Sequence, residues 1–195
     1  MSNTTIRLAT LDDAKKILEI YNPYIETTSI TFEYNKLSLA HFEERMRTII
    51  QKFPFIVYER NGIIIGYAYA SSFHPRAAYA WDCDCSIYMD LSYQGKGIGT
   101  ILYKTLFLLM KEMGYFNIYA LVTSQNPISL SFHKKLGFEI EGHHDKTGYK
   151  FGKWLGVTRL VKRIGDFDKT PEPVKTIYEI NSAPILAHYI EASAN

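Results

Sequence analysis

The sequence predicts an α+β fold in which helices flank a mixed, mostly antiparallel central sheet. Some stretches carry apolar residues at the 3.6-residue spacing of a helix, and others are short runs rich in β-branched and aromatic residues. In chain order these stretches read β-α-α-β-β-β-α-β-α-β-β. Consecutive strands in the first half favour antiparallel pairing, whereas the helices between later strands can act as the crossovers that parallel strands require.

A strand over residues 6–9 and two helices are expected to open the chain. Thr10, with Asp13 three residues later, is an acidic variant of the capping box and predicts the start of the first helix. The second helix is expected to begin near Ser38. It should end before Pro54, because the residue before a proline is disfavoured in the helical conformation.

Three strands are expected next. The pair Asn61-Gly62 separates strands predicted over residues 55–59 and 63–71, and it favours a tight hairpin because both residues accept positive φ angles. A longer strand is predicted over residues 80–89.

The second half of the chain alternates helices and strands. In order, we expect a helix over residues 97–113, a strand over residues 118–123, a helix that ends at Gly137, and strands over residues 138–144 and 153–163. Asn126 is a good N-cap for the second of these helices. Pro127 fits its first position, where a backbone N–H is not needed.

Residues 1–165 are expected to form one domain, since a chain of this length can bury its own core. Residues 166–195 differ in character, with two prolines in residues 170–173 and only a weakly amphipathic stretch over residues 185–190. We interpret them as a C-terminal tail that either docks on the domain or on a second subunit, or stays disordered.

The charge balance and hydropathy exclude several classes of protein. Lys and Arg number 22 against 20 Asp and Glu, so the net charge of +2 gives no electrostatic footprint for nucleic acid. The N-terminus is too polar for a signal peptide, and no apolar stretch approaches the roughly 18 residues of a membrane span. We therefore expect a cytoplasmic protein with no nucleic-acid or membrane partner.

The two cysteines, Cys83 and Cys85, have no second pair that would complete a zinc site. Residues i and i+2 of a strand share a face, so burial side by side is the simpler interpretation. A redox or metal-binding pair is the alternative, and no metal is expected.

The segment QGKGIGT, residues 94–100, lies between a predicted strand and a predicted helix. Glycines let the backbone turn sharply and approach a ligand, and a helix N-terminus favours negative charge. This combination predicts a phosphate-binding loop, with a simple tight turn as the alternative. The spacing differs both from a Walker A loop and from a dinucleotide fingerprint.

This loop, as Q-x-x-G-x-G after a long strand, resembles the acetyl-CoA pyrophosphate loop of the GNAT acetyltransferase superfamily. Residues 126–138, NPISLSFHKKLGF, are similar to that superfamily's cofactor-side helix. More narrowly, TTSITFE at residues 27–33, FHPR at residues 73–76 and GYKFGKW at residues 148–154 resemble phosphinothricin N-acetyltransferases and related enzymes that acetylate amino-acid analogues. The resemblance spans roughly residues 6–163, so that residues 1–165 would form a GNAT domain.

The resemblance implies acetyl-CoA as co-substrate. Backbone amides of the glycine loop would hold its phosphates, its pantetheine arm would pair with the preceding strand, and the later helix would face it. The implied cofactor-binding residues are Ile87, Tyr88, Met89, Gln94, Gly95, Lys96, Gly97, Ile98, Gly99, Thr100, Asn126 and Ser129.

The resemblance also implies direct attack of an amine on the thioester within a ternary complex. Asp84 matches the position of the proposed catalytic base; relatives usually have Glu there, and the shorter side chain favours a bridging water. His133 matches the position of the group that protonates the leaving thiolate, and it could instead serve as the base. The alternatives are an ordinary polar strand residue for Asp84 and an ordinary helix histidine for His133.

The implied acceptor is the α-amine of a small amino-acid analogue such as phosphinothricin, methionine sulfoximine or methionine sulfone. Its carboxylate needs a cation, for which Arg76 is the candidate, and His74 replaces a second basic residue of the relatives. Further pocket-shaping residues are expected to be Phe32, Tyr79 and Trp154. Gly156 stands where relatives tend to have an acidic residue.

Two other functions stay open. The chain could acetylate a polyamine, an aminoglycoside or a protein N-terminus, although a net charge of +2 argues against a polycation as substrate. It could also be a non-catalytic acyl-CoA-binding module, against which the joint presence of Asp84 and His133 argues. The relatives imply a homodimer.

Overall fold

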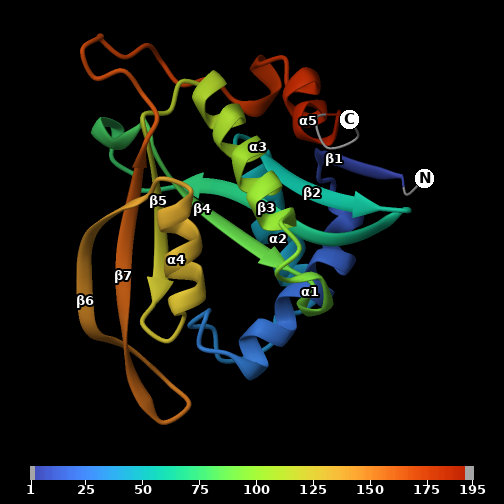
Figure 1. The fold of residues 1–195 in the computed structure, drawn as a ribbon, viewed down its shortest axis with the longest axis vertical. Coiled ribbons are helices and arrows are strands. Elements are labelled where there is room, and N and C mark those ends of the chain that lie inside the picture. Colours follow the sequence, from blue (N-terminus) through green and yellow to red (C-terminus); the bar gives the residue numbers. More distant parts are fainter. Residues whose placement is uncertain (1–2, 192–195) are drawn as a thin grey trace.

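The computed structural model describes residues 3–191 and contains a seven-stranded sheet with the strand order β1-β2-β3-β4-β5-β7-β6 (Figure 1). The elements are β1 (Thr4–Leu8), α1 (Ala14–Thr27), α2 (Leu39–Ile50), β2 (Phe55–Arg60), β3 (Ile63–Ser72), β4 (Asp82–Met89), α3 (Ile98–Glu112), β5 (Asn117–Thr123), α4 (Pro127–Lys135), β6 (Glu139–Lys150), β7 (Lys153–Arg163) and α5 (Ala183–Glu191). Only β4 and β5 pair in parallel among these strands. The predicted α+β class, the mostly antiparallel sheet and the order of the first eleven elements are confirmed.

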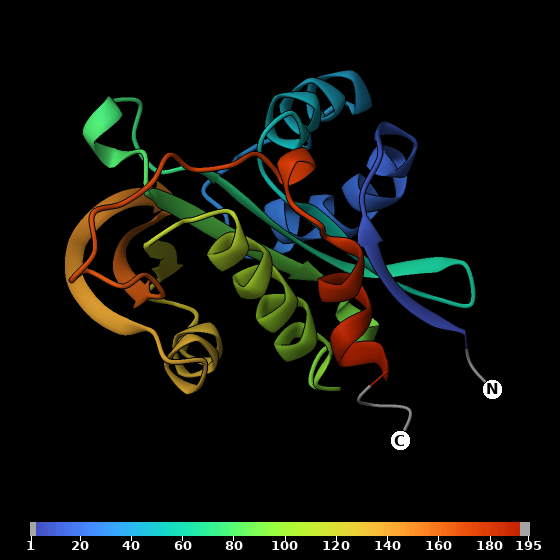
Figure 2. The same cartoon turned by 90° about the horizontal axis from the view of Figure 1, so that it is seen from above.

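The sheet separates two layers of helices. Figure 2 shows α1 and α2 on one side and α3, α4 and α5 on the other. Alternate strand residues therefore pack into two apolar clusters. Tyr67 packs with Ile17 on the α1–α2 side, whereas Cys85 and Leu160 pack with Leu102 on the α3 side.

Three local signals in the sequence are confirmed. Asn61 and Gly62 join β2 to β3 with φ angles of 50° and 77°, as a tight hairpin turn requires. The backbone N–H of Thr10 donates to the Asp13 carboxylate at 2.8 Å. Asn126 caps α4 by accepting a hydrogen bond from a backbone N–H of the first turn at 3.0 Å.

The strand predicted over residues 138–144 is longer in the structure. β6 passes through a register shift between His144 and Gly148 and continues to Lys150, where a turn with two positive φ angles leads into β7. Most of β6 is exposed, so no alternation of polar and apolar residues marks its second half in the sequence. The strand predicted from Ala80 begins only at Asp82, because the preceding residues form a 3-10 turn.

The segment after β7 packs on the α3 side. Ile177 is 2% exposed and belongs to the apolar cluster there, and Leu186 of α5 packs against the same cluster. The Trp81 indole N–H also donates to the carbonyl of Glu172 at 2.7 Å.

Cys83 and Cys85 are free and buried, so ordinary burial of this pair is confirmed. Across residues 3–191, no group of three or more His, Cys, Asp or Glu side chains is arranged to hold a metal ion. No helix in that range has both the length and the apolar character to cross a membrane.

Candidate active site

The parallel pair β4–β5 is joined only at its beginning. Residues 82–84 of β4 pair with residues 117–119 of β5, whereas β3 pairs with β4 as far as Met89. From Cys85 onward, the edge of β4 that faces β5 therefore has no strand partner. The two strands diverge and leave a split in the sheet with unpaired backbone groups along it.

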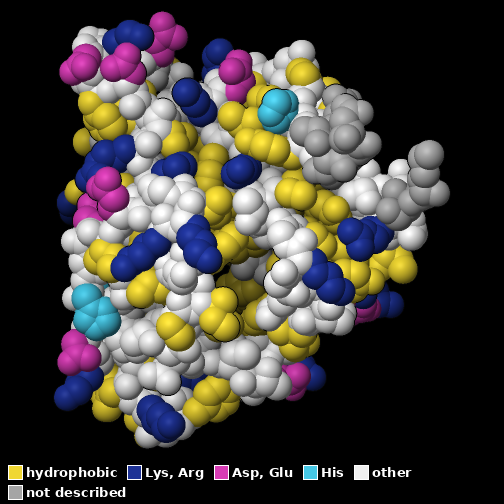
Figure 3. Space-filling model, in the orientation of Figure 1, with side chains coloured by type: hydrophobic (Ala, Val, Ile, Leu, Met, Phe, Trp, Pro, Cys, Tyr) yellow, Lys and Arg dark blue, Asp and Glu magenta, His cyan; other side chains and the backbone are white. Residues whose placement is uncertain are grey.

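A cleft that opens to solvent occupies this split. Its walls come from both unpaired strand edges, from α3 and α4, and from the segment after α1. The lining residues are Ile30, Cys85, Ser86, Ile87, Tyr88, Tyr103, Ala120, Leu121, Val122, Thr123, Asn126, Ser129 and His133. Figure 3 shows a hollow between α3 and α4, with apolar side chains in its walls and Lys and Arg side chains around it.

The glycine-rich segment adjoins this cleft at the N-terminus of α3. A Cβ added to Gly99 would lie 3.5 Å from Ile87, which lines the cleft. Gly95 and Gly97 have φ angles of 75° and 79°, and a Cβ at either would meet no atom within 4 Å. Within the described chain, the backbone N–H groups of residues 95–97 make no hydrogen bond. They form, with the first turn of α3, an open cradle that fits a diphosphate.

Gln94 and Lys96 have structural partners beside this cradle. The Gln94 amide donates to the Tyr24 hydroxyl at 2.8 Å, and that hydroxyl donates to the carbonyl of Met89 at 2.5 Å. These bonds tie the end of β4 and the start of the loop to α1. The Lys96 ammonium turns back and donates to the carbonyl of Ser92 at 3.1 Å.

His133 is buried at the inner wall of the cleft, with 3% of its surface exposed. Its Nδ1 lies 2.8 Å from the carbonyl oxygen of Ser129, which can only accept, so Nδ1 carries the proton. Its Nε2 is then free to accept from the Tyr103 hydroxyl at 3.3 Å. Burial lowers the pKa of His133, and the Ser129 carbonyl offsets part of this effect. The imidazole is therefore neutral at pH 7.

Asp84 lies just before the split, on the opposite face of the sheet. Its neighbour Cys85 points to the α3 side, where its thiol approaches the Tyr103 hydroxyl at 3.6 Å. Asp84 thus points to the α1–α2 side, as does Ser86, which lines the cleft. Burial raises the pKa of Asp84 to about 6, although the nearby charge of Arg159 lowers it. Asp84 and His133 therefore flank the split from the two faces of the sheet.

The segment between α1 and α2, residues 28–34, forms an outer wall and contributes Ile30 to the cleft. Lys150, at the tip of the β6–β7 hairpin, is 2% exposed and anchors this segment. Its ammonium donates to the carbonyl of Thr31 at 2.7 Å and to that of Ile25, in the last turn of α1, at 2.8 Å. A cation is favourable at this helix end because of the helix dipole.

Two further contacts join the same elements. Phe32 lies directly against the backbone of Gly148, where an added Cβ would come within 2.2 Å of the ring. The Tyr34 hydroxyl donates to the carbonyl of Tyr149. The hairpin tip and the segment after α1 lie at the same end of the molecule (Figure 1), and this segment borders the cleft on the α1–α2 side.

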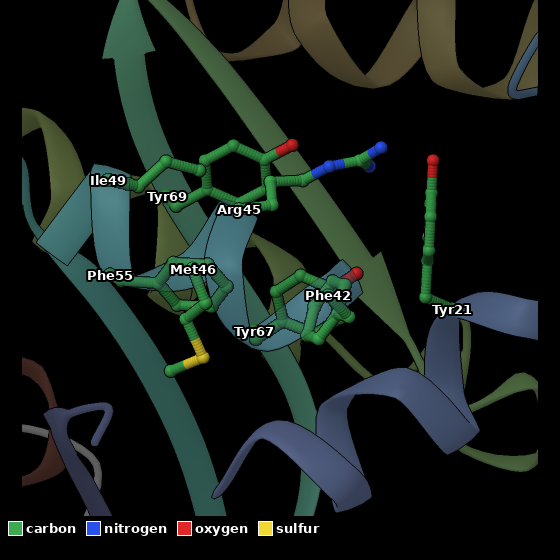
Figure 4. A pocket seen from close by; sticks show the side chains of 8 residues that line it. All are labelled: Tyr21, Phe42, Arg45, Met46, Ile49, Phe55, Tyr67 and Tyr69. Atoms are coloured by element: carbon green, nitrogen blue, oxygen red, sulfur yellow. The ribbon is translucent and has the colours of Figure 1, made fainter. Parts of the chain in front are cut away.

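A second, narrow pocket lies beneath α2 and is lined mainly by aromatic side chains. Figure 4 shows the Arg45 guanidinium and the hydroxyls of Tyr21 and Tyr69 pointing to the same side. Arg45 pairs with Glu33 at 2.7 Å, and the Tyr21 hydroxyl shares a hydrogen bond with Thr31 at 3.0 Å. Arg45 and Tyr21 thus attach residues 28–34 to α2 and α1.

None of the five residues expected to contact substrate lines the cleft itself, although Phe32 belongs to the segment at its outer wall. His74, Arg76 and Tyr79 are exposed on the turn after β3, where the His74 and Tyr79 rings pack together at 4.7 Å. Trp154 is 62% exposed and packs on Tyr149, on the opposite face of the hairpin from Lys150. Their role in binding stays a prediction.

Sequence patterns missed several residues of the site. Tyr103 lies inside an apolar helix stripe, which indicates only core packing, and Thr123 is the last residue of a strand. Arg159 lies in the middle of β7 without a motif around it. No local signal marks these residues, because the pairing of distant strands and helices brings Tyr103 and Thr123 to the cleft and places Arg159 on the face of the sheet that carries Asp84.

The structure also explains Gly156, where an acidic residue was expected from the relatives. A Cβ at this position would lie 2.9 Å from the His143 ring and 3.0 Å from the carbonyl oxygen of His144. The imidazole of His143 thus occupies the space that a side chain at position 156 would need.

A split between two parallel strands, an unpaired strand edge and an open glycine-rich loop at the adjoining helix form the arrangement that the family resemblance predicts for a coenzyme A-dependent acyltransferase. The comparisons give the family. The family model described as an acetyltransferase (GNAT) domain matches residues 6–158, and the chain belongs to this family as an acetyl-CoA-dependent N-acetyltransferase.

Named relatives cover nearly the whole chain. The chain is 29% identical over 175 residues to the phosphinothricin N-acetyltransferase of Streptomyces viridochromogenes, covering 90% of this chain and 95% of the relative. It is 31% identical over 166 residues to the L-methionine sulfoximine/L-methionine sulfone acetyltransferase of Salmonella typhimurium, covering 83% and 95%. Among solved structures, the chain resembles the crystal structure of a GNAT superfamily phosphinothricin acetyltransferase from Sinorhizobium meliloti in complex with AcCoA. The sequence identity is 33% and the TM-score is 0.83, and the match covers 87% of this chain and 93% of that one.

Proposed function

We propose that this enzyme transfers the acetyl group of acetyl-CoA to the α-amine of a small amino-acid analogue of the phosphinothricin, methionine sulfoximine or methionine sulfone type. The observation that carries the proposal is the split sheet, whose cleft is lined by residues from both faces and adjoins the cradle at residues 95–99. A thioester threaded from the α3 side would meet an amine entering from the α1–α2 side. The names of the relatives support this acceptor class.

The cleft fits the co-substrate chemically. The cradle offers unpaired N–H groups for a diphosphate, and the free edge of β4 offers main-chain donors and acceptors for an amide-containing arm. Gly99 lies at the junction of the two, where an added Cβ would contact the side chains of Ile87 and Phe132 at 3.5 Å. Residues 126–133 of α4 close the inner wall.

In the proposed reaction, the amine nitrogen attacks the thioester carbonyl carbon, a C–N bond forms and the C–S bond breaks. The ammonium must first lose one proton, for which the Asp84 carboxylate is the acceptor, directly or through water. The sulfur leaves as a thiolate and takes up the second proton that the nitrogen loses. The step balances because the ammonium loses two protons in all, one to the Asp84 carboxylate and one to the thiolate.

His133 and Tyr103 are the proposed carriers of this second proton. The neutral imidazole offers Nε2 as an acceptor, and the Tyr103 hydroxyl, which contacts it at 3.3 Å, lines the cleft. This arrangement favours a His133 that receives and passes on a proton over one that starts as an imidazolium acid.

A thiol-release assay tests the proposal. The enzyme with acetyl-CoA should release coenzyme A thiol on addition of L-methionine sulfone, L-methionine sulfoximine or phosphinothricin. It should do so more slowly with polyamines, aminoglycosides and peptides. Binding of acetyl-CoA without thiol release on any amine would favour the acyl-CoA-binding module instead.

A homodimer is proposed from the relatives alone. Sedimentation equilibrium of the full chain would test it, since the expected species has twice the mass of the chain.

A further inference from the structure

Arg159 occupies an unusual position on the acceptor side of the cleft. Its register partner on β5 is Leu121, which lines the cleft, and directly paired residues point to the same face. Two positions earlier on β5, Tyr119 is the register partner of Asp84 on β4. Arg159 is therefore on the face of the sheet that carries Asp84, with β5 between their two strands.

Two aromatic rings support the Arg159 guanidinium. Phe73 and Tyr119 stack with centroids 4.3 Å apart, and the guanidinium lies 6.0 Å from the first ring and 5.8 Å from the second. Such stacking fixes the plane of a guanidinium without using its donors.

The hydrogen-bonding groups of Arg159 are only partly used. Its Nε lies 2.7 Å from the Glu141 carboxylate as an ion pair without hydrogen-bond geometry, and its side chain is 39% exposed. Within residues 3–191 its two Nη groups have no hydrogen-bond partner. They present the fork that binds a carboxylate with two parallel bonds.

We propose that Arg159 binds the carboxylate of the amino-acid acceptor and so makes the enzyme prefer amines that carry an α-carboxylate. The inference rests on the proposed function and assigns to Arg159 the role that the sequence alone favoured for Arg76. An amine held near Asp84 and a carboxylate held by Arg159 would orient the acceptor across the mouth of the split.

The test compares two amines that differ only in the carboxylate, L-methionine sulfone and 3-(methylsulfonyl)propan-1-amine. Arg159→Met should lower kcat/KM for the amino acid by about 20-fold, as loss of a charge-assisted hydrogen bond predicts. It should change kcat/KM for the carboxylate-free amine by less than about twofold. Arg159→Lys should recover only part of the loss, because an ammonium lacks the fork.

Arg163→Met is the matched control. Arg163 lies four residues further along β7, on the same face, and makes a similar cross-strand ion pair with Glu139 at 2.8 Å. It pairs in register with Asn117, where β4 and β5 are still joined. This variant should leave the ratio between the two amines unchanged.

Calorimetric binding of L-methionine sulfone in the presence of coenzyme A gives a readout that does not depend on turnover. Arg159→Met should weaken this binding by a factor similar to the loss in kcat/KM. Equal losses for both amines, no loss for either, or a selective loss in Arg76→Met instead would overturn the assignment and leave the transfer reaction intact. An unmodified enzyme that neither binds nor acetylates either amine would contradict the proposed function and, with it, this assignment.

Discussion

The two ends of the cleft differ in what they are made of. The cradle at residues 95–99 is one contiguous segment, and its binding groups are backbone amides that any sequence with the right glycines provides. The acceptor end combines Asp84, Arg159, residues 28–34 and residues 148–150, which lie on four separate parts of the chain. In the proposed function, a co-substrate shared by a whole family would thus be held by a local motif, whereas acceptor choice would depend on side chains that can change one at a time.

The largest expected effect is at the cradle. Gly97→Asp places a side chain and a negative charge where φ is 79° and phosphates are expected, and should weaken acetyl-CoA binding by about a thousandfold. Gly62→Asp is the control, because Gly62 has a φ of 77° and equally open surroundings in the β2–β3 turn. Isothermal titration with acetyl-CoA measures both, and equal affinity in Gly97→Asp would remove the diphosphate from this loop.

At the acceptor end, burial of the Asp84 carboxylate should lower the free energy of unfolding, a cost that the backbone amides of the cradle do not carry. The pKa of Asp84 is raised from 3.8 to about 6, so folding disfavours its ionised form, and this loss of stability is absent below pH 4 and complete above pH 6. Asp84→Asn should therefore stabilise the fold at pH 8 by at most about 3 kcal/mol and by nothing at pH 4. Urea unfolding at both pH values measures the difference.

Asp82→Asn is the control for this stability effect, since the Asp82 carboxylate accepts a hydrogen bond from the Asn117 amide at 2.8 Å. It should not stabilise the protein at pH 8. A gain from Asp84→Asn that is equal at both pH values would show that charge burial is not its cause.

The pH dependence of kcat/KM should reflect the ionisation of the same Asp84 carboxylate. Asp84 must be ionised to accept a proton, so kcat/KM should fall as the pH drops through about 6. Asp84→Asn should lower kcat by about a hundredfold, abolish this limb of the profile and leave acetyl-CoA affinity within about twofold. A variant with an unchanged rate of acetyl transfer in single-turnover experiments would exclude Asp84 as the base.

The smallest of these effects concerns the wall of the acceptor end. Lys150→Met removes two hydrogen bonds to the backbone around residues 28–34 and should raise the KM for the amine by about tenfold, with kcat and acetyl-CoA affinity little changed. Lys153→Met, in the same hairpin but exposed, should have no effect. Amide exchange of residues 28–34 should be faster only in Lys150→Met; unchanged exchange would show that the hairpin does not position this wall.

Prediction from sequence succeeded where one segment carries its own signal. Asn61-Gly62, the Thr10–Asp13 cap and the Asn126 cap each act within four residues, so their geometry follows from local chemistry. It failed where exposure removed the pattern, as in the second half of β6. The roles of Asp84 and His133 came from resemblance, and their position on opposite faces of the sheet could not be derived from spacing along the chain.

By itself, the sequence determined the fold class, the order of the first eleven elements and a glycine loop at a helix N-terminus, because turns, caps and apolar periodicity act over short distances. Only the tertiary structure decided where β4 and β5 part, which face each titratable group occupies, that Lys150 binds the backbone of Ile25 and Thr31, and that Arg159 shares a face with Asp84. These features depend on register between strands far apart in the chain, and a shift of one residue would turn each side chain to the other face.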